Sequence, residues 1–373
     1  MQDYNTEHPF DLTLSEEQQM TWDMLRKFAE TELRPQARKT ESDGRPSDEL
    51  IEKIKSLDLI SLIIPEAYGG IGLKQDSISN ALALEALAYG DLSLAMSVSI
   101  PLLTAQIIAE HGSEEQQAEL LPELASGSIF HVGLGINNVS LATDPYQSNV
   151  LAKESGKEII LNGSKTGIAF ADEAKTFLIS ASNESGECNL YFINKDQDGV
   201  ELEEKEFMGL KGAPLSQINL SNCKIDVSQK LGGHNYSLNY QSLVDSSRIG
   251  MSALALGVCQ AVLDYVVPYT NERVAFDEPI SNRQSVAFMI ADMAIETEAL
   301  RLMVYKSAVL KDLDEDFHKQ ASLTYRFAAH HGMKIGTDGV QLLGGHGFTH
   351  EHPVELWYRN LRAIGIFEGG AGV

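Results

Sequence analysis

The side chains best suited to bind a metal ion lie together near the C-terminal end of this 373-residue sequence. His346, His350, Glu351 and His352 fall within seven positions, and the glycines before them and Pro353 after them predict a loop in which they could converge. Histidines in surface loops more often have no metal bound. We therefore expect no metal site.

Glu368 is a candidate catalytic residue, because a carboxylate can act as a general base. It follows the apolar residues Ile366 and Phe367 and precedes two glycines. A single glutamate is more often a solvated surface charge, so its type and position alone do not make it catalytic.

Motifs of several common chemistries are missing. The fragments closest to GxGxxG, Gly133-Leu134-Gly135 and Gly345-His346-Gly347, lack the third glycine, which argues against a dinucleotide-binding fold of the Rossmann type. The patterns GxxxxGK[ST], HExxH and GxSxG do not occur either. This excludes the usual P-loop, zincin and serine-hydrolase interpretations.

The composition is that of a globular protein, with 43% hydrophobic and 22% charged residues, and the length predicts two or three domains. The formal net charge of −24 opposes binding to nucleic acids and anionic membranes, which requires clustered lysine and arginine. Three cysteines without a CxxC pair favour a reducing compartment, and we expect the cytoplasm. The first residues do not resemble an export signal, and we expect no stretch of roughly 18 apolar residues that could span a membrane.

Hydrophobic periodicity divides the chain into three parts. Residues 14–128 have helical spacing, with cap residues at Ser15 and Ser113. Between about 130 and 237, short runs rich in isoleucine, leucine and phenylalanine, separated by polar residues and glycine, predict strands. Helical periodicity returns from Leu243 onward. The order is helical, then β, then helical.

Several short sequence motifs make this order of helical and β parts specific to one family. They are Pro65 to Leu73 (PEAYGGIGL), Leu161 to Lys165 (LNGSK), Gly209 to Pro214 (GLKGAP), Asn271 to Ile280 (NERVAFDEPI), Gln341 to Phe348 (QLLGGHGF) and Ile366 to Gly370 (IFEGG). They resemble the motifs of the acyl-CoA dehydrogenase family, in the same order and over nearly the whole chain.

The resemblance implies an α+β fold of three domains: an N-terminal helical domain (1–129), a middle β domain (130–237) and a C-terminal four-helix bundle (238–373). It also implies an oxidoreductase of fatty acid metabolism that holds FAD and an acyl-CoA thioester between these domains. One residue removes the α-proton, and the β-hydrogen leaves as hydride to the flavin, which gives the trans-2-enoyl-CoA.

Glu368 matches the family's catalytic base, and this match reverses the surface-charge interpretation. Desolvation by a bound acyl chain would raise its pKa and strengthen it as a base. The family's donors to the thioester oxygen are the backbone N–H of the base residue and a flavin ribityl hydroxyl. One subgroup carries its base just before a characteristic arginine, here Arg248, but that position is Ser247, which cannot serve.

The resemblance also assigns the substrate contacts. Asp245 and Arg248 match a substrate-side pair on the helix that opens the C-terminal domain, with an exposed ion pair as the alternative interpretation. The other residues that we expect at the substrate are Thr143, Phe367 and Gly369.

The cofactor contacts implied by the resemblance come from two subunits. One group matches contacts to the FAD of a neighbouring subunit, where arginine suits a diphosphate; it comprises Arg273, Val274, Ala275, Phe276, Arg283, Gln284, Gln341, Gly344 and Gly345. The second group lies at the flavin and comprises Asn137, Thr143, Gly167, Ile168, Ala169, Gly370 and Gly372. A shared site implies a homo-oligomer, which we expect to be a tetramer.

The chain departs from the family where the flavin would lie. Of the family's TEPGAGSD loop, placed here at residues 137–144, only Asp144 is retained, and Gly167 stands where the family has a tryptophan. Phe170 is a candidate to replace that ring. The altered loop leaves one alternative, a flavin-poor relative that only binds. A second alternative is a dehydrogenase of acyl groups held by a carrier protein, and no feature of the sequence distinguishes the two kinds of thioester.

The resemblance finally suggests an electron-transferring flavoprotein as the electron acceptor. In the family this partner docks near the PEEYGGLGL word, which makes Ile71 and Leu73 the candidate contacts here. Burial of the two side chains in the protein core is the alternative interpretation.

Overall fold

The computed structural model describes residues 13–73, 76–140 and 144–367. Residues 1–12, 74–75, 141–143 and 368–373 lie outside this description, and with them the predicted site residues Thr143, Glu368, Gly369, Gly370 and Gly372.

The N-terminal part is helical, as the periodicity predicts. Ser15 and Ser113 each form a capping box at a helix start, in which the hydroxyl accepts from the third backbone N–H and a glutamine side chain reaches back. The helices are α1 (Glu16–Phe28), α2 (Ala37–Asp43), α3 (Asp48–Lys55), α4 (Leu59–Ile63), α5 (Ser77–Ala88), α6 (Leu92–His111) and α7 (Glu114–Ala125).

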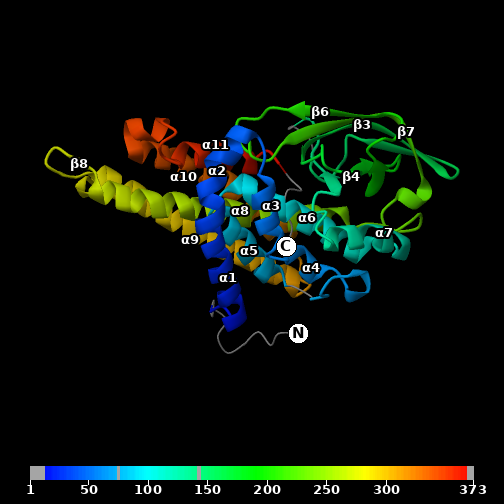
Figure 1. The fold of residues 1–373 in the computed structure, drawn as a ribbon, viewed down its shortest axis with the longest axis horizontal. Helices are drawn as coiled ribbons and strands as arrows, with labels where there is room; N and C mark the ends of the chain where they lie inside the picture. The colour runs from blue at the N-terminus through cyan, green and yellow to red at the C-terminus, as the bar shows by residue number, and fades with distance from the viewer. Residues whose placement is uncertain (1–12, 74–75, 141–143, 368–373) are drawn as a thin grey trace.

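The middle part forms a twisted sheet, which Figure 1 shows at one end of the molecule. Strand β4 pairs in parallel with β1 and antiparallel with β5, while β2, β3, β7 and β6 form antiparallel neighbours. The strands are β1 (Val132–Gly135), β2 (Leu151–Ser155), β3 (Glu158–Ala169), β4 (Thr176–Ser182), β5 (Cys188–Asn194), β6 (Val200–Lys205) and β7 (Leu215–Asp226).

The C-terminal part is a bundle of long helices, α8 (Tyr240–Glu272), α9 (Gln284–Asp312) and α10 (His318–Leu343), followed by the shorter α11 (Val354–Ile364). The chain passes from α8 to α9 through a small hairpin of β8 (Val274–Ala275) and β9 (Glu278–Pro279). The predicted order of helical, β and helical parts is therefore confirmed. The exact domain boundaries remain a prediction.

Two helices of the core are long and apolar enough to cross a membrane by length and composition, namely α6 and α8. The expectation that no stretch reaches this length is therefore wrong. Most residues of both helices are buried inside the protein, 89% and 78% of the apolar window respectively. Their continuous apolar character is thus explained by packing on all sides, since a helix that is hydrophobic all round is a buried one.

A buried ion pair fastens the N-terminal helices to the C-terminal bundle. Glu85 of α5 pairs with Arg301 of α9, and the hydroxyl of Tyr305 donates to the second carboxylate oxygen of Glu85 at 3.1 Å. Burial raises the pKa of Glu85, and the arginine opposes this shift. The pair holds α9 against α5.

Candidate functional site

The hairpin β8–β9 and the end of α10 enclose a cleft of about 800 Å³, called here the hairpin cleft. Seven residues that the sequence assigns to the cofactor line it: Arg273, Ala275, Phe276, Arg283, Gln341, Gly344 and Gly345. Val274 and Gln284 lie beside these residues in the chain, in β8 and at the start of α9.

The donors of the hairpin cleft suit a diphosphate. Arg273 is exposed, and Arg283 holds its guanidinium 2.9 Å from a carboxylate oxygen of Glu278. Gly344 adopts a φ of +57°, and a Cβ at Gly344 or Gly345 would meet nothing within 4 Å, so the backbone is open to an approaching anion. Two guanidinium groups beside an open glycine turn therefore fit the phosphates of FAD.

The histidines of the predicted loop have protein partners. His346 lines the hairpin cleft, and its Nδ1 lies 2.9 Å from the Tyr269 hydroxyl, while Nδ1 of His352 lies 2.7 Å from the Tyr265 hydroxyl. The two imidazole rings stack with their centroids 5.2 Å apart. Within the described residues, no group of three or more metal-binding side chains is arranged to hold an ion.

A second set of predicted residues meets at the end of β3. Gly167 has a φ of +68°, and a Cβ there would lie 2.5 Å from Cε1 of Phe367 and 3.5 Å from Nδ2 of Asn137. Phe367 is buried, and its ring meets that of Phe207 edge to face with centroids 5.3 Å apart. The residue just before the predicted base therefore packs against Gly167, which the sequence assigns to the flavin, and Asn137 approaches the same glycine.

The neighbours of Gly167 do not face this space. Ile168 packs in the core of the β domain and Ala169 in the larger core that includes the helices, so only their backbone is available to a ligand. Phe170 is also buried, with its ring stacked on Phe130 at 4.0 Å. The replacement of the family's tryptophan by Phe170 stays a prediction, and the ring that lies beside Gly167 is that of Phe367.

A buried lysine holds the strand end that carries Asn137. The Nζ of Lys165 donates to the Ile136 carbonyl at 3.0 Å and to Oδ1 of Asn138 at 2.7 Å. Burial lowers the pKa of Lys165 to about 7, because the charged ammonium loses its hydration. The sequence match LNGSK contains this lysine, but it did not reveal the role of its side chain.

Asp245 and Arg248 lie on one face of α8 within a polar cluster. Oδ1 of Asp245 accepts from the Tyr146 hydroxyl at 2.8 Å, and Oδ2 lies 2.8 Å from Nδ1 of His318. Arg248 donates to Tyr146 and, at 2.9 Å, to the Ser322 hydroxyl. The carboxylate is nearly inaccessible to solvent, so the alternative of an exposed ion pair is wrong for this pair.

Four residues of this cluster were not found from the sequence. Tyr146 comes from the loop that follows Asp144, and His318, Ser322 and Tyr325 all lie on α10. The hydroxyl of Tyr325 donates to the Phe367 carbonyl at 3.2 Å, and the Arg248 guanidinium lies over the Tyr325 ring at 5.5 Å. The spacing of Ser322 and Tyr325 by three residues on a helix was the available signal, since it places both on one face.

The two predicted halves of the cofactor site are far apart in one chain. Figure 1 places the β8 hairpin at one end of the long axis and the strands of the middle domain toward the other end. The β8–β9 hairpin beside the hairpin cleft and the middle domain that carries Gly167 therefore lie toward different ends of the same subunit.

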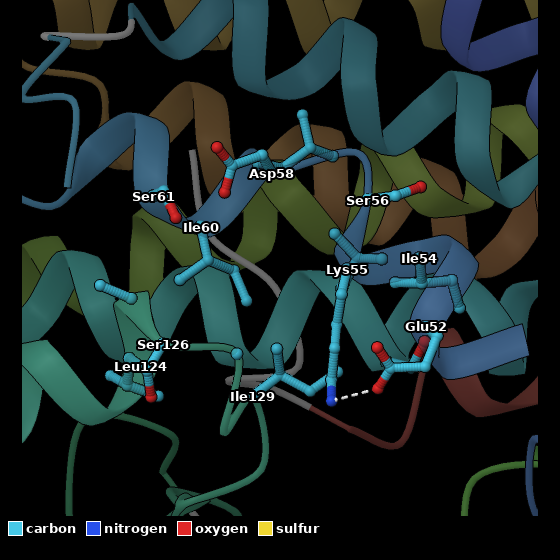
Figure 2. Close-up of a pocket in the computed structure, with 15 residues that line it drawn as sticks. Glu52, Ile54, Lys55, Ser56, Asp58, Ile60, Ser61, Leu124, Ser126 and Ile129 are labelled. Carbon is cyan, nitrogen blue, oxygen red and sulfur yellow. Dashed lines mark hydrogen bonds and ion pairs between the residues drawn. The ribbon is translucent and has the colours of Figure 1, made fainter. Parts of the chain in front are cut away.

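A further cavity, of about 360 Å³, lies between α3, α4, α6 and α7 (Figure 2). Apolar side chains such as Ile60 and Ile129 line it, and Lys55 pairs with Glu52 at 2.7 Å on its rim. Among the described residues, none that the sequence assigns to the cofactor or the substrate lines this cavity.

Comparison with known proteins decides the family. Models of the N-terminal, middle and C-terminal domains of acyl-CoA dehydrogenases match residues 15–128, 139–223 and 239–373. The chain belongs to the acyl-CoA dehydrogenase family. Acyl-CoA dehydrogenases are FAD-dependent oxidoreductases, so the resemblance drawn from the sequence words and the FAD prediction are both confirmed.

Individual members of the acyl-CoA dehydrogenase family are similar over almost the whole chain. The probable acyl-CoA dehydrogenase YngJ of Bacillus subtilis is 32% identical over 365 residues, which cover 95% of each chain. The butyryl-CoA dehydrogenase structure from Megasphaera elsdenii has a TM-score of 0.83 at 28% identity and covers 96% of this chain and 95% of its own. A structure described as an electron transferring flavoprotein of Acidaminococcus fermentans has a TM-score of 0.84 at 31% identity, with coverage of 96% and 95%.

Proposed function

We propose that this chain oxidises an acyl-CoA thioester to the trans-2-enoyl-CoA, with Glu368 as the base that removes the α-proton. The observation that carries the proposal is the packing of Phe367, the residue before Glu368, against Gly167 beside Asn137. This contact supports a position for the base next to the residues assigned to the flavin.

The chemistry requires a proton acceptor on the protein, next to the α-carbon of the substrate, and a fixed thioester carbonyl. Glu368 takes the α-proton as the electrons of the Cα–H bond begin to form the new double bond. FAD, when bound, supplies the acceptor for the β-hydride. Ser247, at the alternative base position, has a hydroxyl that is no base near neutral pH, which supports Glu368.

The cofactor site is proposed to be shared between subunits. Arg273, Arg283 and the Gly344–Gly345 turn would hold the diphosphate of a neighbour's FAD, while Asn137 and Gly167 would meet the ring end of the chain's own FAD. Figure 1 places the β8–β9 hairpin and the strands of the middle domain toward opposite ends of the molecule, which supports this arrangement. Exposed apolar residues along α9, namely Phe288, Ile295 and Leu302, support a homo-oligomer, for which we propose a tetramer.

An electron-transferring flavoprotein is the proposed electron acceptor, docking at Ile71 and Leu73. These side chains are 44% and 51% exposed, so the alternative that both belong to the core is wrong. The N–H of Ile71 donates to the Ser61 carbonyl at 2.8 Å, and Ser61 lines the cavity of Figure 2. An apolar side chain of the partner could thus contact two exposed apolar residues that lie beside the cavity of Figure 2.

The substrate and the compartment remain proposals. The similarity to a butyryl-CoA dehydrogenase makes a short acyl-CoA the first substrate to test, and a carrier-protein thioester is the alternative. All three cysteines are free and buried, which supports the proposed cytoplasmic location.

Replacing the base tests the function. Glu368→Gln is expected to keep FAD and thioester binding but to lower flavin reduction by butyryl-CoA by roughly 10²- to 10⁴-fold, because an amide cannot accept the α-proton. Glu351→Gln, which changes an exposed glutamate in the same C-terminal region, is the matched control and is expected to behave like wild type. Reduction at the wild-type rate in Glu368→Gln would exclude this residue as the base.

The alternative function, a flavin-poor binding relative, predicts a different result. Its support is the altered loop at residues 137–144. A purified protein that takes up no FAD even at saturating concentration, as judged by the visible spectrum, would favour this alternative over the dehydrogenase.

A further inference from the structure

His346 lies in the hairpin cleft without a role in the proposed function. Its side chain is exposed and lines the cleft directly after the open turn of Gly344 and Gly345. The resemblance assigns these two glycines to the cofactor, but not His346. The described residues hold no metal site there, so the place of this imidazole in the cleft needs another explanation.

The hydrogen bond at Nδ1 decides which nitrogen of the imidazole carries the proton. A neutral imidazole has one N–H donor and one acceptor nitrogen. Nδ1 of His346 lies 2.9 Å from the Tyr269 hydroxyl, whereas the Leu343 carbonyl lies 3.5 Å from the same hydroxyl, beyond the usual range for O–H···O. Because the hydroxyl has a single proton, it donates to Nδ1. The proton of the imidazole is therefore on Nε2.

Neighbouring groups hold the ring of His346 in place. It stacks on the ring of His352 with centroids 5.2 Å apart and an interplanar angle of 16°. The ring of Tyr269 meets it at 75°. The His346 carbonyl accepts from the backbone N–H of Thr349 at 3.2 Å and from the Thr349 hydroxyl at 2.9 Å. The N–H at Nε2 thus belongs to a ring that needs little reordering when a ligand binds.

The cleft has room for a third donor beside its two arginines. Within the part of the chain that the structure describes, Nε2 of His346 has no protein partner. Arg273 and Arg283 supply the positive charge of the cleft, and Glu278, 2.9 Å from Arg283, offsets part of it. A diphosphate has several negatively charged acceptor oxygens, so it can accept from the imidazole as well as from the guanidinium groups.

We propose that His346 binds the diphosphate in the hairpin cleft through its Nε2–H, and that the Tyr269 hydroxyl keeps the proton on that nitrogen. The proposal rests on the function proposed above in taking the diphosphate to be that of FAD. His346 is a ligand-binding residue in this role. Tyr269 is a positioning residue that acts through the imidazole.

Titration of flavin-depleted protein with FAD, followed by flavin fluorescence, measures the contribution of the donor. His346→Phe removes the N–H and keeps a flat ring to stack on His352. We expect its Kd for FAD to be roughly 10-fold higher than that of wild type, the lower end of the range for a hydrogen bond to a charged group. His346→Gln places an amide N–H near the position of Nε2 and is expected to recover part of the affinity.

Tyr269→Phe tests how the donor is kept in place. It removes the hydroxyl and keeps the ring, so the imidazole proton can occupy either nitrogen. We expect a Kd for FAD between those of wild type and His346→Phe. The double variant is expected to bind FAD as His346→Phe does, because the hydroxyl acts only through the imidazole. Additive losses would overturn the positioning role of Tyr269.

His352→Phe is the matched control. Nδ1 of His352 lies 2.7 Å from the Tyr265 hydroxyl and its ring stacks on His346, but this described residue does not line the hairpin cleft. The melting temperature is expected to fall, since the hydroxyl loses its acceptor, while the Kd for FAD stays at the wild-type value. A role of His346 in packing alone predicts this same pattern for His346→Phe, and a Kd that is unchanged or lower in that variant would overturn the proposal.

ADP separates this inference from the proposed function, because it carries a diphosphate without a flavin. Its affinity, measured by isothermal titration calorimetry, is expected to fall in His346→Phe by the same factor as that of FAD. Wild type that binds ADP through His346 but takes up no FAD overturns the proposed function and leaves the role of His346 standing. Wild type that binds FAD with the same Kd as His346→Phe overturns the role of His346 alone.

Discussion

The ring of Phe367 occupies the space that a side chain at position 167 would need. A Cβ built on Gly167 would lie 2.5 and 2.6 Å from two ring carbons of Phe367, and the φ of +68° also disfavours any other residue. An aromatic ring therefore stands beside β3 where the family has a tryptophan, but it is supplied by the residue before the proposed base. The glycine and the phenylalanine form one packing unit across two domains.

Gly167→Ala is expected to destabilise the protein through both effects. The left-handed backbone costs about 1–2 kcal/mol for a residue with a Cβ, and the overlap with Phe367 adds about 1–3 kcal/mol. Gly186→Ala is the control, since Gly186 has a φ of +85° but nothing within 4 Å of the added Cβ. Urea unfolding should show a larger loss for Gly167→Ala, and equal losses would contradict the contact.

Arg273→Ala is expected to weaken FAD retention and subunit assembly together. A charge-assisted hydrogen bond contributes about 1.5–3 kcal/mol, which corresponds to roughly 10- to 150-fold in affinity. Size-exclusion chromatography with a flavin absorbance trace measures both properties. Arg45→Ala, at an exposed arginine paired with Asp172, is the control. An unchanged oligomer with full flavin content would make Arg273 a surface charge only.

FAD added to the purified protein is expected to raise the melting temperature. The hairpin cleft keeps its two arginines and its glycine turn, whereas Ile168 and Ala169 offer only backbone at the ring end. Partial loss of FAD during purification should therefore be reversible. A ligand that binds only the folded state stabilises it by about 2.7 kcal/mol at a hundredfold excess over Kd. No thermal shift at saturating FAD would argue against the dehydrogenase.

Lys165 is expected to make the stability of the protein depend on pH. Its pKa is about 7 in the folded protein against an ordinary value of 10.5, so between these values the unfolded chain binds more protons than the folded one. The free energy of unfolding therefore rises with pH across this window, by at most about 1.4 kcal/mol per pH unit.

Urea unfolding of wild type and Lys165→Met at about pH 7.5 and about pH 9.5 measures this dependence. The wild-type protein should gain stability relative to the variant as the pH rises. Lys153→Met, at a side chain that is exposed on β2, is the control and should keep the wild-type slope. The same slope in Lys165→Met and wild type would show that the buried amine does not titrate in this range.

Local patterns predicted much of the fold. Ser15 and Ser113 begin helices because a hydroxyl and a glutamine three residues later satisfy the first backbone N–H groups without help from the rest of the protein. The strands at Glu158, Thr176 and Leu190 follow from short runs of strand-forming residues. The motifs around Arg273 and Gly344 each supply residues that line the hairpin cleft, because each motif is short and its residues stay close in space.

The sequence by itself determined the family and the order of helical and β parts, since each depends on neighbours along the chain, and it named seven of the residues that line the hairpin cleft. Only the tertiary structure decided which far-apart residues meet: Phe367 over Gly167, Tyr325 on the Phe367 carbonyl, and the apolar α6 and α8 in the core. The physical reason is that side-chain packing and buried hydrogen bonds depend on shape in three dimensions, which the spacing of residues in one chain does not specify.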